Sequence, residues 1–146
     1  MSPKLLSFIV GGAIPAILYG VTGIFQKMSA KGGGSAAVYL ICFGASTVVM
    51  GLALHFMLRE PVGPAGGIGF AFLAGATFAL GAGLISIALI KYQAPIAQLS
   101  PLYNANVLIT VLLGVWLLAE GQGLQLGRLL GGTVLIVIGA ILVANA

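Results

Sequence analysis

Long apolar segments separated by short polar stretches make up nearly the whole chain. Charged side chains fall only at or beyond the ends of these segments. The segments are too long for strands, and they lack the alternation of polar and apolar positions that marks a half-buried strand. A helix needs about 20 apolar residues to cross the hydrocarbon core of a bilayer. The pattern therefore predicts five membrane-spanning helices, approximately over residues 5–26, 35–58, 66–90, 94–119 and 127–143.

The polar stretches between the segments are only a few residues long, so successive helices should be antiparallel neighbours. Lys27, Lys31 and a glycine triplet follow the first segment, and Arg59-Glu60-Pro61 follows the second. We expect an all-α polytopic membrane protein in which residues 1–146 form a single five-helix transmembrane domain. We interpret the first segment as a retained helix; the alternative is a cleaved signal peptide.

Composition supports a membrane protein. Of the 146 residues, 60% are hydrophobic and 5% are charged, and the mean hydropathy is +1.20. A soluble domain carries roughly 25% charged residues, and disordered chains are polar and charged, so both classes are excluded. The 23 glycines are interpreted as sites of close helix contact in lipid. The formal charge of +4 is spread among helix ends, which indicates topology signals and not a nucleic-acid surface.

The cationic side chains do not favour one orientation in the membrane. With five spans, one side would hold Lys4, Arg59 and Arg128, and the other Lys27, Lys31 and Lys91. The positive-inside rule needs a surplus of Lys and Arg on one side, and this count is tied. Two alternatives stay open: dual topology, with copies pairing as an antiparallel homodimer, or a single orientation set by the terminal amine or a partner.

Polar side chains inside the spans fall into two rows. After Pro15, which deprives the Gly11 carbonyl of its donor and predicts a kink, the first row comprises Tyr19, Thr22 and Gln26. The second row, in the fourth span, comprises Ser100, Tyr103, Asn104, Asn106 and Thr110. Because polar groups in lipid are costly unless they face water or a partner, the rows predict a path for a neutral polar solute. The alternative is ordinary interhelical hydrogen bonding, worth about 0.6 kcal/mol on average.

Small residues recur at four-residue spacing in two spans. Gly127 and Gly131 in the fifth span predict a dimer seam, since such a face lets another backbone come close. The third span carries a longer row, interpreted as packing within one protomer: Ala71, Gly75, Ala79 and Gly83.

Several segments resemble the EamA-like domain of the drug/metabolite transporter superfamily. These are the aromatic-glycine sequence at 19–27, the proline-containing entry to the fourth helix at 94–102, the segment 114–120 ending in Glu, and Gly131 and Gly139. The resemblance implies one half of a ten-helix transporter of inverted repeats, located in a bacterial cytoplasmic (inner) membrane. It implies as partners membrane lipid, a small-molecule substrate and a second five-helix half, either another copy or a paralogue.

The chain departs from the four-helix multidrug transporters of that superfamily, because its first helix contains no carboxylate. Glu60 and Glu120 both lie at helix ends. No set of residues suited to a metal, a phosphate loop or a Ser-His-Asp triad is present, so we expect no enzyme, no cofactor, no metal and no nucleic-acid partner. We predict a transporter of a small polar metabolite working by alternating access; the alternatives are a flippase subunit for a lipid-linked sugar, or a structural or regulatory membrane subunit.

Overall fold

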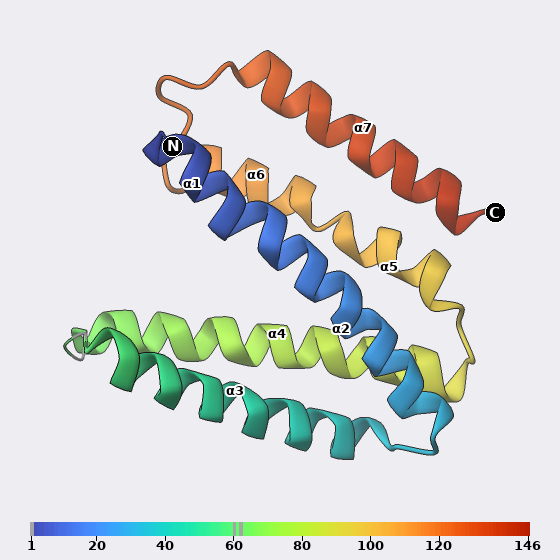
Figure 1. Ribbon diagram of the computed structural model, residues 1–146. Helices are drawn as coiled ribbons and strands as arrows, with labels where there is room; N and C mark the ends of the chain where they lie inside the picture. Colours follow the sequence, from blue (N-terminus) through green and yellow to red (C-terminus); the bar gives the residue numbers. More distant parts are fainter. Residues whose placement is uncertain (1, 60, 62) are drawn as a thin grey trace. The chain divides into compact units, whose positions relative to one another are not determined.

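The computed structural model describes residues 2–59, 61 and 63–146, and within them it contains helices and no strands (Figure 1). Five helical stretches of this part are long and apolar enough to cross a membrane: Leu5–Lys31, Ala36–Leu58, Ala65–Lys91, Ile96–Trp116 and Leu126–Ala144. The prediction of an all-α polytopic membrane protein is confirmed. Glu60, expected at a helix end, lies outside the described residues.

Contacts divide the chain into two compact units, Met1–Gln93 and Ala94–Ala146, and each is described by itself. The single five-helix domain expected from the sequence stays a prediction.

The first span of the first unit is a continuous helix of uneven pitch. It comprises α1 (Pro3–Phe8), a π-helical turn (Ile9–Ala13) and α2 (Ile14–Lys31). It runs five residues beyond the predicted end at Gln26. The apolar pattern misplaced this end because a lysine can extend its ammonium group toward water while its backbone stays helical.

The glycine triplet, not the first lysine, ends α2. Gly33 adopts a left-handed φ of 83°, and the Gly34 amide donates to the Ser29 carbonyl at 3.0 Å. A Cβ on Gly34 would lie 2.8 Å from that carbonyl oxygen. This six-residue closure satisfies a carbonyl of the last helical turn, and it requires glycine at both positions.

The two other helices of this unit are α3 (Ala36–Leu58) and α4 (Ala65–Lys91). Ser35 caps α3, because its hydroxyl accepts from the Val38 amide at 3.2 Å. The α4 helix packs against both α2 and α3 (Figure 1). The buried positions are Gly23 and Gln26 of α2 and Ala82, Gly83, Ser86 and Leu89 of α4.

The small-residue row of α4 is only partly used for packing inside this unit. Gly83 is buried, and a Cβ there would lie 3.1 Å from Leu40 Cδ1 of α3. Ala71, Gly75 and Ala79 are exposed. Close packing therefore involves the C-terminal half of α4, and the remaining small residues leave an open face.

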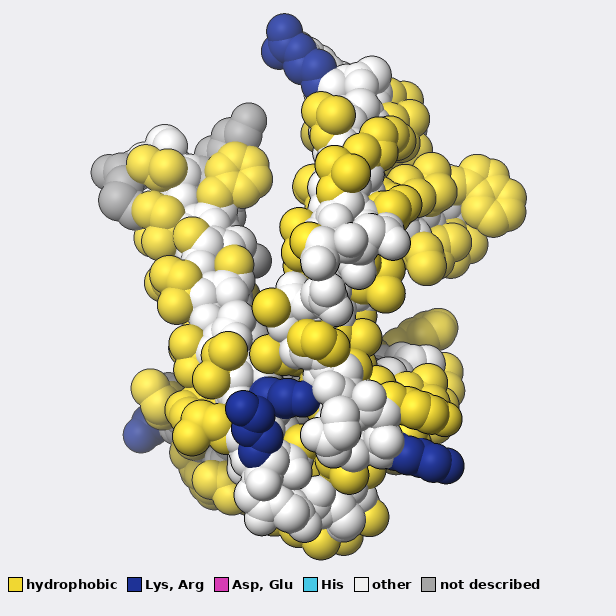
Figure 2. Space-filling model, turned by 90° about the vertical axis from the view of Figure 1, so that its right-hand side faces the viewer, with side chains coloured by type: hydrophobic (Ala, Val, Ile, Leu, Met, Phe, Trp, Pro, Cys, Tyr) yellow, Lys and Arg dark blue, Asp and Glu magenta, His cyan; other side chains and the backbone are white. Residues whose placement is uncertain are grey.

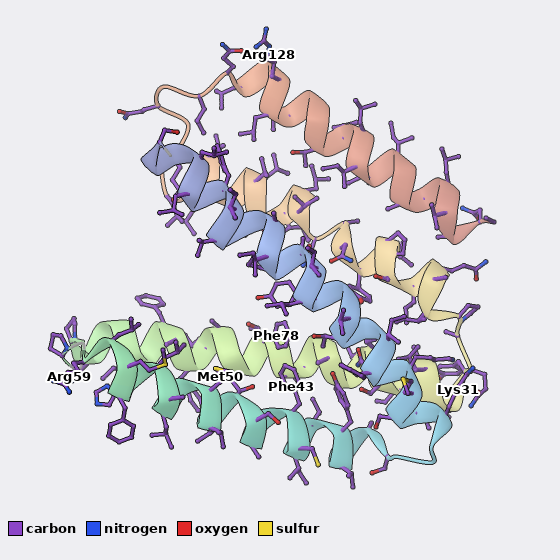
Figure 3. The ribbon with its side chains drawn as sticks, in the orientation of Figure 1. Lys31, Phe43, Met50, Arg59, Phe78 and Arg128 are labelled. Atoms are coloured by element: carbon purple, nitrogen blue, oxygen red, sulfur yellow. The ribbon has the colours of Figure 1, made fainter. Side chains whose placement is uncertain are left out.

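Aromatic rings bridge α3 and α4. Phe43 of α3 stacks on Phe78 of α4 with ring centroids 5.7 Å apart (Figure 3). Within α3, Tyr39 stacks on Phe43 at 5.9 Å. Elsewhere the outer faces carry bare apolar side chains, such as Phe56 and Met57, which are 74% and 77% exposed. Figure 2 shows a surface that is mostly hydrophobic, with few cationic side chains. Such surfaces suit lipid and not water.

The second unit consists of α5 (Ile96–Asn104), α6 (Val107–Trp116) and α7 (Leu126–Ala144). The α7 helix packs along both α5 and α6, with Thr133 and Ala140 buried. The continuous helix predicted over residues 94–119 is replaced by two shorter ones. The first of the two begins after Pro95, and the second ends at Trp116. Beyond Trp116 the Glu120 amide bonds the Gly114 carbonyl at 3.1 Å and Ala119 adopts a left-handed φ of 55°, so the chain leaves the helix there.

Candidate functional site

The fourth span is interrupted near its middle, between α5 and α6. There the amides of Ala105, Asn106 and Leu108 bond to carbonyls three residues back, at 3.2, 3.2 and 3.1 Å. An α-helix bonds four residues back, so the chain tightens into a 3₁₀ turn at this point. Short 3₁₀ stretches inside a helix often mark functional hinges.

Local side-chain chemistry accounts for this interruption. Pro101 lies inside α5 and offers no amide to the carbonyl one turn earlier. The Asn104 side chain then donates from Nδ2 to the Ser100 carbonyl at 2.8 Å and to Ser100 Oγ at 3.4 Å. A side chain that bonds the carbonyl of the preceding turn competes with the main-chain ladder.

The polar side chains predicted in this span surround the 3₁₀ turn, and we call them the fourth-span row: Ser100, Tyr103, Asn104, Asn106 and Thr110. Ser100 and Tyr103 are half-buried, and the other three are exposed. The row therefore forms an open surface of hydroxyl, phenol and amide groups on this unit.

Asn106 is an exposed member of the fourth-span row whose side chain does not cap the helix that follows. It occupies the N-cap position of α6, yet its side chain makes no capping hydrogen bond. Its carbonyl is used locally, since it accepts from the Thr110 amide at 3.0 Å and from Thr110 Oγ1 at 3.3 Å. An asparagine that caps a helix usually has an extended backbone, whereas Asn106 has a right-handed helical one, with φ −53° and ψ −20°. Its side-chain amide is therefore not used in capping and stays exposed.

The first-span row has a different environment. Tyr19 is 70% exposed, and Thr22 Oγ1 donates to the Leu18 carbonyl of its own helix at 2.9 Å. Gln26 is only 6% exposed, and its Nε2 donates to the Ala82 carbonyl at 3.2 Å and to Ser86 Oγ at 2.9 Å. We call this contact between α2 and α4 the Gln26 link. It is an interhelical hydrogen bond, which is the alternative that the sequence left open to a solute path along this row.

A second irregularity lies just before the first-span row. The Ile14 amide bonds the Ile9 carbonyl, five residues back, and Pro15 follows without an amide of its own. The structure thus has a π-helical turn directly before Pro15, and the predicted kink itself stays a prediction. Such turns are rare in proteins overall and occur often at functional sites. Gly11 and Gly12 face open space, since a Cβ at either would meet nothing within 4 Å.

Comparison with protein families, with characterised proteins and with solved structures finds no match. The resemblance to EamA-like domains therefore depends on the sequence segments quoted above, and it stays a prediction.

The predicted seam residues point away from the packing within the second unit. Thr133 and Ala140, two turns apart on α7, are buried. Gly127 and Gly131 are exposed, and a Cβ at either would meet nothing within 4 Å. This face is open for a further helix, as the seam hypothesis requires.

Two features of these sites escaped the sequence analysis. Ser86, which accepts from Gln26, sits alone in an apolar stretch, and only its place one helical turn beyond the buried Ala82 reveals its role. A shallow depression of about 190 Å³ at the ends of α5 and α7 is lined by Ala94, Pro95, Gln98, Leu99, Leu102 and Ala144.

Among the described residues, no three His, Cys, Asp or Glu side chains gather as a metal site would need.

Proposed function

We propose that the chain is one half of a transporter that moves a small polar metabolite by alternating access. Two five-helix halves, inverted with respect to each other, would enclose the path. In this proposal the chain is an EamA-like member of the drug/metabolite transporter superfamily in a bacterial cytoplasmic membrane, and its partner is a second copy or a paralogue. The fourth-span row supplies the solute site.

The observation that carries the proposal is the Asn106 side chain, which makes no capping hydrogen bond and lies at a helix interruption inside an apolar span. Transporters commonly bind solutes where a spanning helix is discontinuous, near the bilayer midplane. The interruption at residues 105 and 106 lies at the midpoint of the Ile96–Trp116 span. Neutral amide, phenol and hydroxyl groups fit a polar solute that carries hydrogen-bonding groups and no fixed charge.

The exposure of the fourth-span row also supports the presence of a second transporter half facing it. In hydrocarbon, an exposed amide costs several kcal/mol unless water or a partner satisfies it. Asn104 Nδ2 already bonds the Ser100 carbonyl, whereas the exposed Asn106 side chain does not cap its helix. A facing half would enclose Asn106 in a solvated cavity and remove that cost.

The test is transport by purified protein in liposomes, with a panel of neutral polar solutes. Tyr103→Phe and Asn104→Ala should each reduce the rate about tenfold, the effect of one lost hydrogen bond to the solute, without changing expression or dimerisation. Asn145→Ala is the matched control, because Asn145 Nδ2 makes the same bond to a carbonyl four residues back, at 2.7 Å, outside the row. Unchanged transport in both row variants would remove the fourth-span row from the proposal. Movement of a lipid-linked sugar, with no solute transport, would instead assign the flippase alternative.

The assembly has its own test. Reporter fusions at both termini should show both orientations of the unmodified protein. Lysines introduced at Met28 and Ala30, in the last turn of α2 and outside the glycine closure, should bias that end of the helix to the cytoplasm. A single orientation before modification would contradict the antiparallel homodimer and leave pairing with a paralogue.

A further inference from the structure

One end of the first unit gathers cationic side chains. The Gln26 link fixes the register of α2 and α4, since Gln26 Nε2 and Ser86 Oγ are 2.9 Å apart. The helices α2 and α4 run in the same direction, because the single helix α3 returns between them. Five residues beyond the link, α2 ends at Lys31 and α4 ends at Lys91. Both ammonium groups therefore emerge at about the same level, roughly 7.5 Å beyond the link along the helix axes.

Lys27, one turn before Lys31, adds a third charge, and we call these three residues the lysine face. Both lysines at the helix ends are exposed, and Lys27 is half-buried. Of the other cations of the unit, Arg59 lies at the opposite end of the α3–α4 pair, as Figure 3 shows for Lys31 and Arg59, and Lys4 belongs to α1 at the start of the first span. The lysine face is thus confined to one end of the unit.

The chain contains two acidic residues, Glu60 and Glu120, and neither belongs to α2 or α4. The helix ends offset little of the charge. Two C-termini contribute roughly −0.5 each and the N-terminus of α3 roughly +0.5, so about half a charge is cancelled out of the three that the lysines carry. Neutralising helix dipoles therefore does not account for all three lysines.

The lysine face lies at the level expected for lipid headgroups. It ends two spans that are long and apolar enough to cross a bilayer. Tyr92, which is 71% exposed, follows Lys91, and the Lys91 ammonium lies 5.9 Å from its ring centroid. Exposed tyrosines beside lysines are typical of the membrane–water interface.

We propose that the lysine face binds the phosphate groups of anionic phospholipids. A cluster of ammonium groups at the ends of packed spans, in reach of the headgroup layer, attracts anionic lipid in preference to zwitterionic lipid. This site is separate from the fourth-span row, and the proposal does not depend on transport.

The experiment is native mass spectrometry of the full chain in a neutral detergent, titrated with phosphatidylglycerol or with phosphatidylcholine of the same acyl chains. Phosphatidylglycerol should bind at least about tenfold more tightly. Lys31→Gln/Lys91→Gln should weaken its binding about thirtyfold, roughly fivefold for each lysine near a membrane surface. Lys31→Arg/Lys91→Arg, which keeps both charges, should bind as the unmodified chain does.

The matched control is Arg59→Gln/Arg128→Gln, which removes the same charge from elsewhere and should change phosphatidylglycerol binding less than about threefold. Equal binding of both lipids, retained binding by the lysine-to-glutamine variant, or an equal loss in the arginine control would each overturn the proposal. If the lysine-to-glutamine variant does not fold, the unmodified chain decides. Its phosphatidylglycerol binding should weaken strongly between about 0.05 and 0.5 M NaCl, and binding insensitive to salt would contradict the proposal.

Discussion

Side-chain amides occur inside both units, but one is buried and hydrogen-bonded while the other is exposed. In the first unit, the Gln26 amide is buried and donates to two acceptors on α4. In the second unit, the Asn106 amide is exposed and does not even cap its own helix. The same functional group in an apolar span thus serves as a structural link in one place and remains available in the other.

This difference teaches how to separate polar residues that hold helices together from those that bind a solute. A structural amide should affect stability when it is removed, and a solute-binding amide should affect transport. Substitutions in the two units can test this separation.

Replacing each amide by leucine should give opposite outcomes. Asn106→Leu should reduce liposome transport by about tenfold or more, through a lost hydrogen bond to the solute, while unfolding in SDS titrations stays within about 0.5 kcal/mol of the unmodified chain. Gln26→Leu should lower the free energy of unfolding by about 1–2 kcal/mol, because Ser86 Oγ and the Ala82 carbonyl lose their donor. A large stability loss in the Asn106 variant would end the distinction between the two regions.

Glycines should separate the units in a similar way. Gly83→Val should destabilise the fold by about 2 kcal/mol, since a Cβ there already lies 3.1 Å from Leu40 Cδ1. Gly131→Val should leave the fold intact and weaken dimerisation, because a Cβ at Gly131 meets nothing within 4 Å. Unfolding in SDS and crosslinking in membranes measure the two effects. A Gly131 variant that dimerises normally would argue against the seam.

A double-mutant cycle measures the Gln26 link itself. Gln26→Leu and Ser86→Ala, singly and together, should reveal a coupling of about 1 kcal/mol, within the range found for interhelical hydrogen bonds in membranes. The matched cycle of Gln26→Leu with Thr77→Ala should give none, because Thr77 Oγ1 donates only to its own helix, to the Leu73 and Ala74 carbonyls at 3.0 Å. Additive effects of Gln26 and Ser86 would show that the link contributes nothing measurable.

Helix ends provide the smallest contrast. The α2 helix is followed by Gly33 in the left-handed region, whereas α6 is followed by Ala119 with a φ of 55°. Ala119→Gly should stabilise the chain by about 0.5–1 kcal/mol, and Gly33→Ala should destabilise it by a similar amount, because only glycine adopts this conformation without strain. Shifts of the same sign in the two variants would contradict this account.

The fourth-span row and the 3₁₀ turn within it differ in how far the sequence predicts them. The members of the fourth-span row were identified from their polarity in an apolar span, which does not depend on the contacts of the chain. The 3₁₀ turn among them was not predicted, although its causes, Pro101 and Asn104, are local. An apolar pattern reports which residues can face lipid, and it is insensitive to whether an amide bonds three or four residues back.

Gln26 shows where prediction from sequence stops. Its spacing placed it on one helical face with Tyr19 and Thr22, and that spacing says nothing of what lies opposite. The structure places Gln26 at 6% exposure and Tyr19 at 70% on the same helix. Whether an amide is satisfied depends on a helix some sixty positions further along the chain, at Ser86.

The sequence by itself determined the class of this protein and the number of its spans, because hydrophobic length and the position of charges are properties of each segment alone. It also determined which residues are polar within the spans. Which of these polar groups are paired follows from the packing of the helices, since pairing depends on the register and approach of two of them. That approach is controlled by small residues such as Gly83 and by close contacts that no single segment contains.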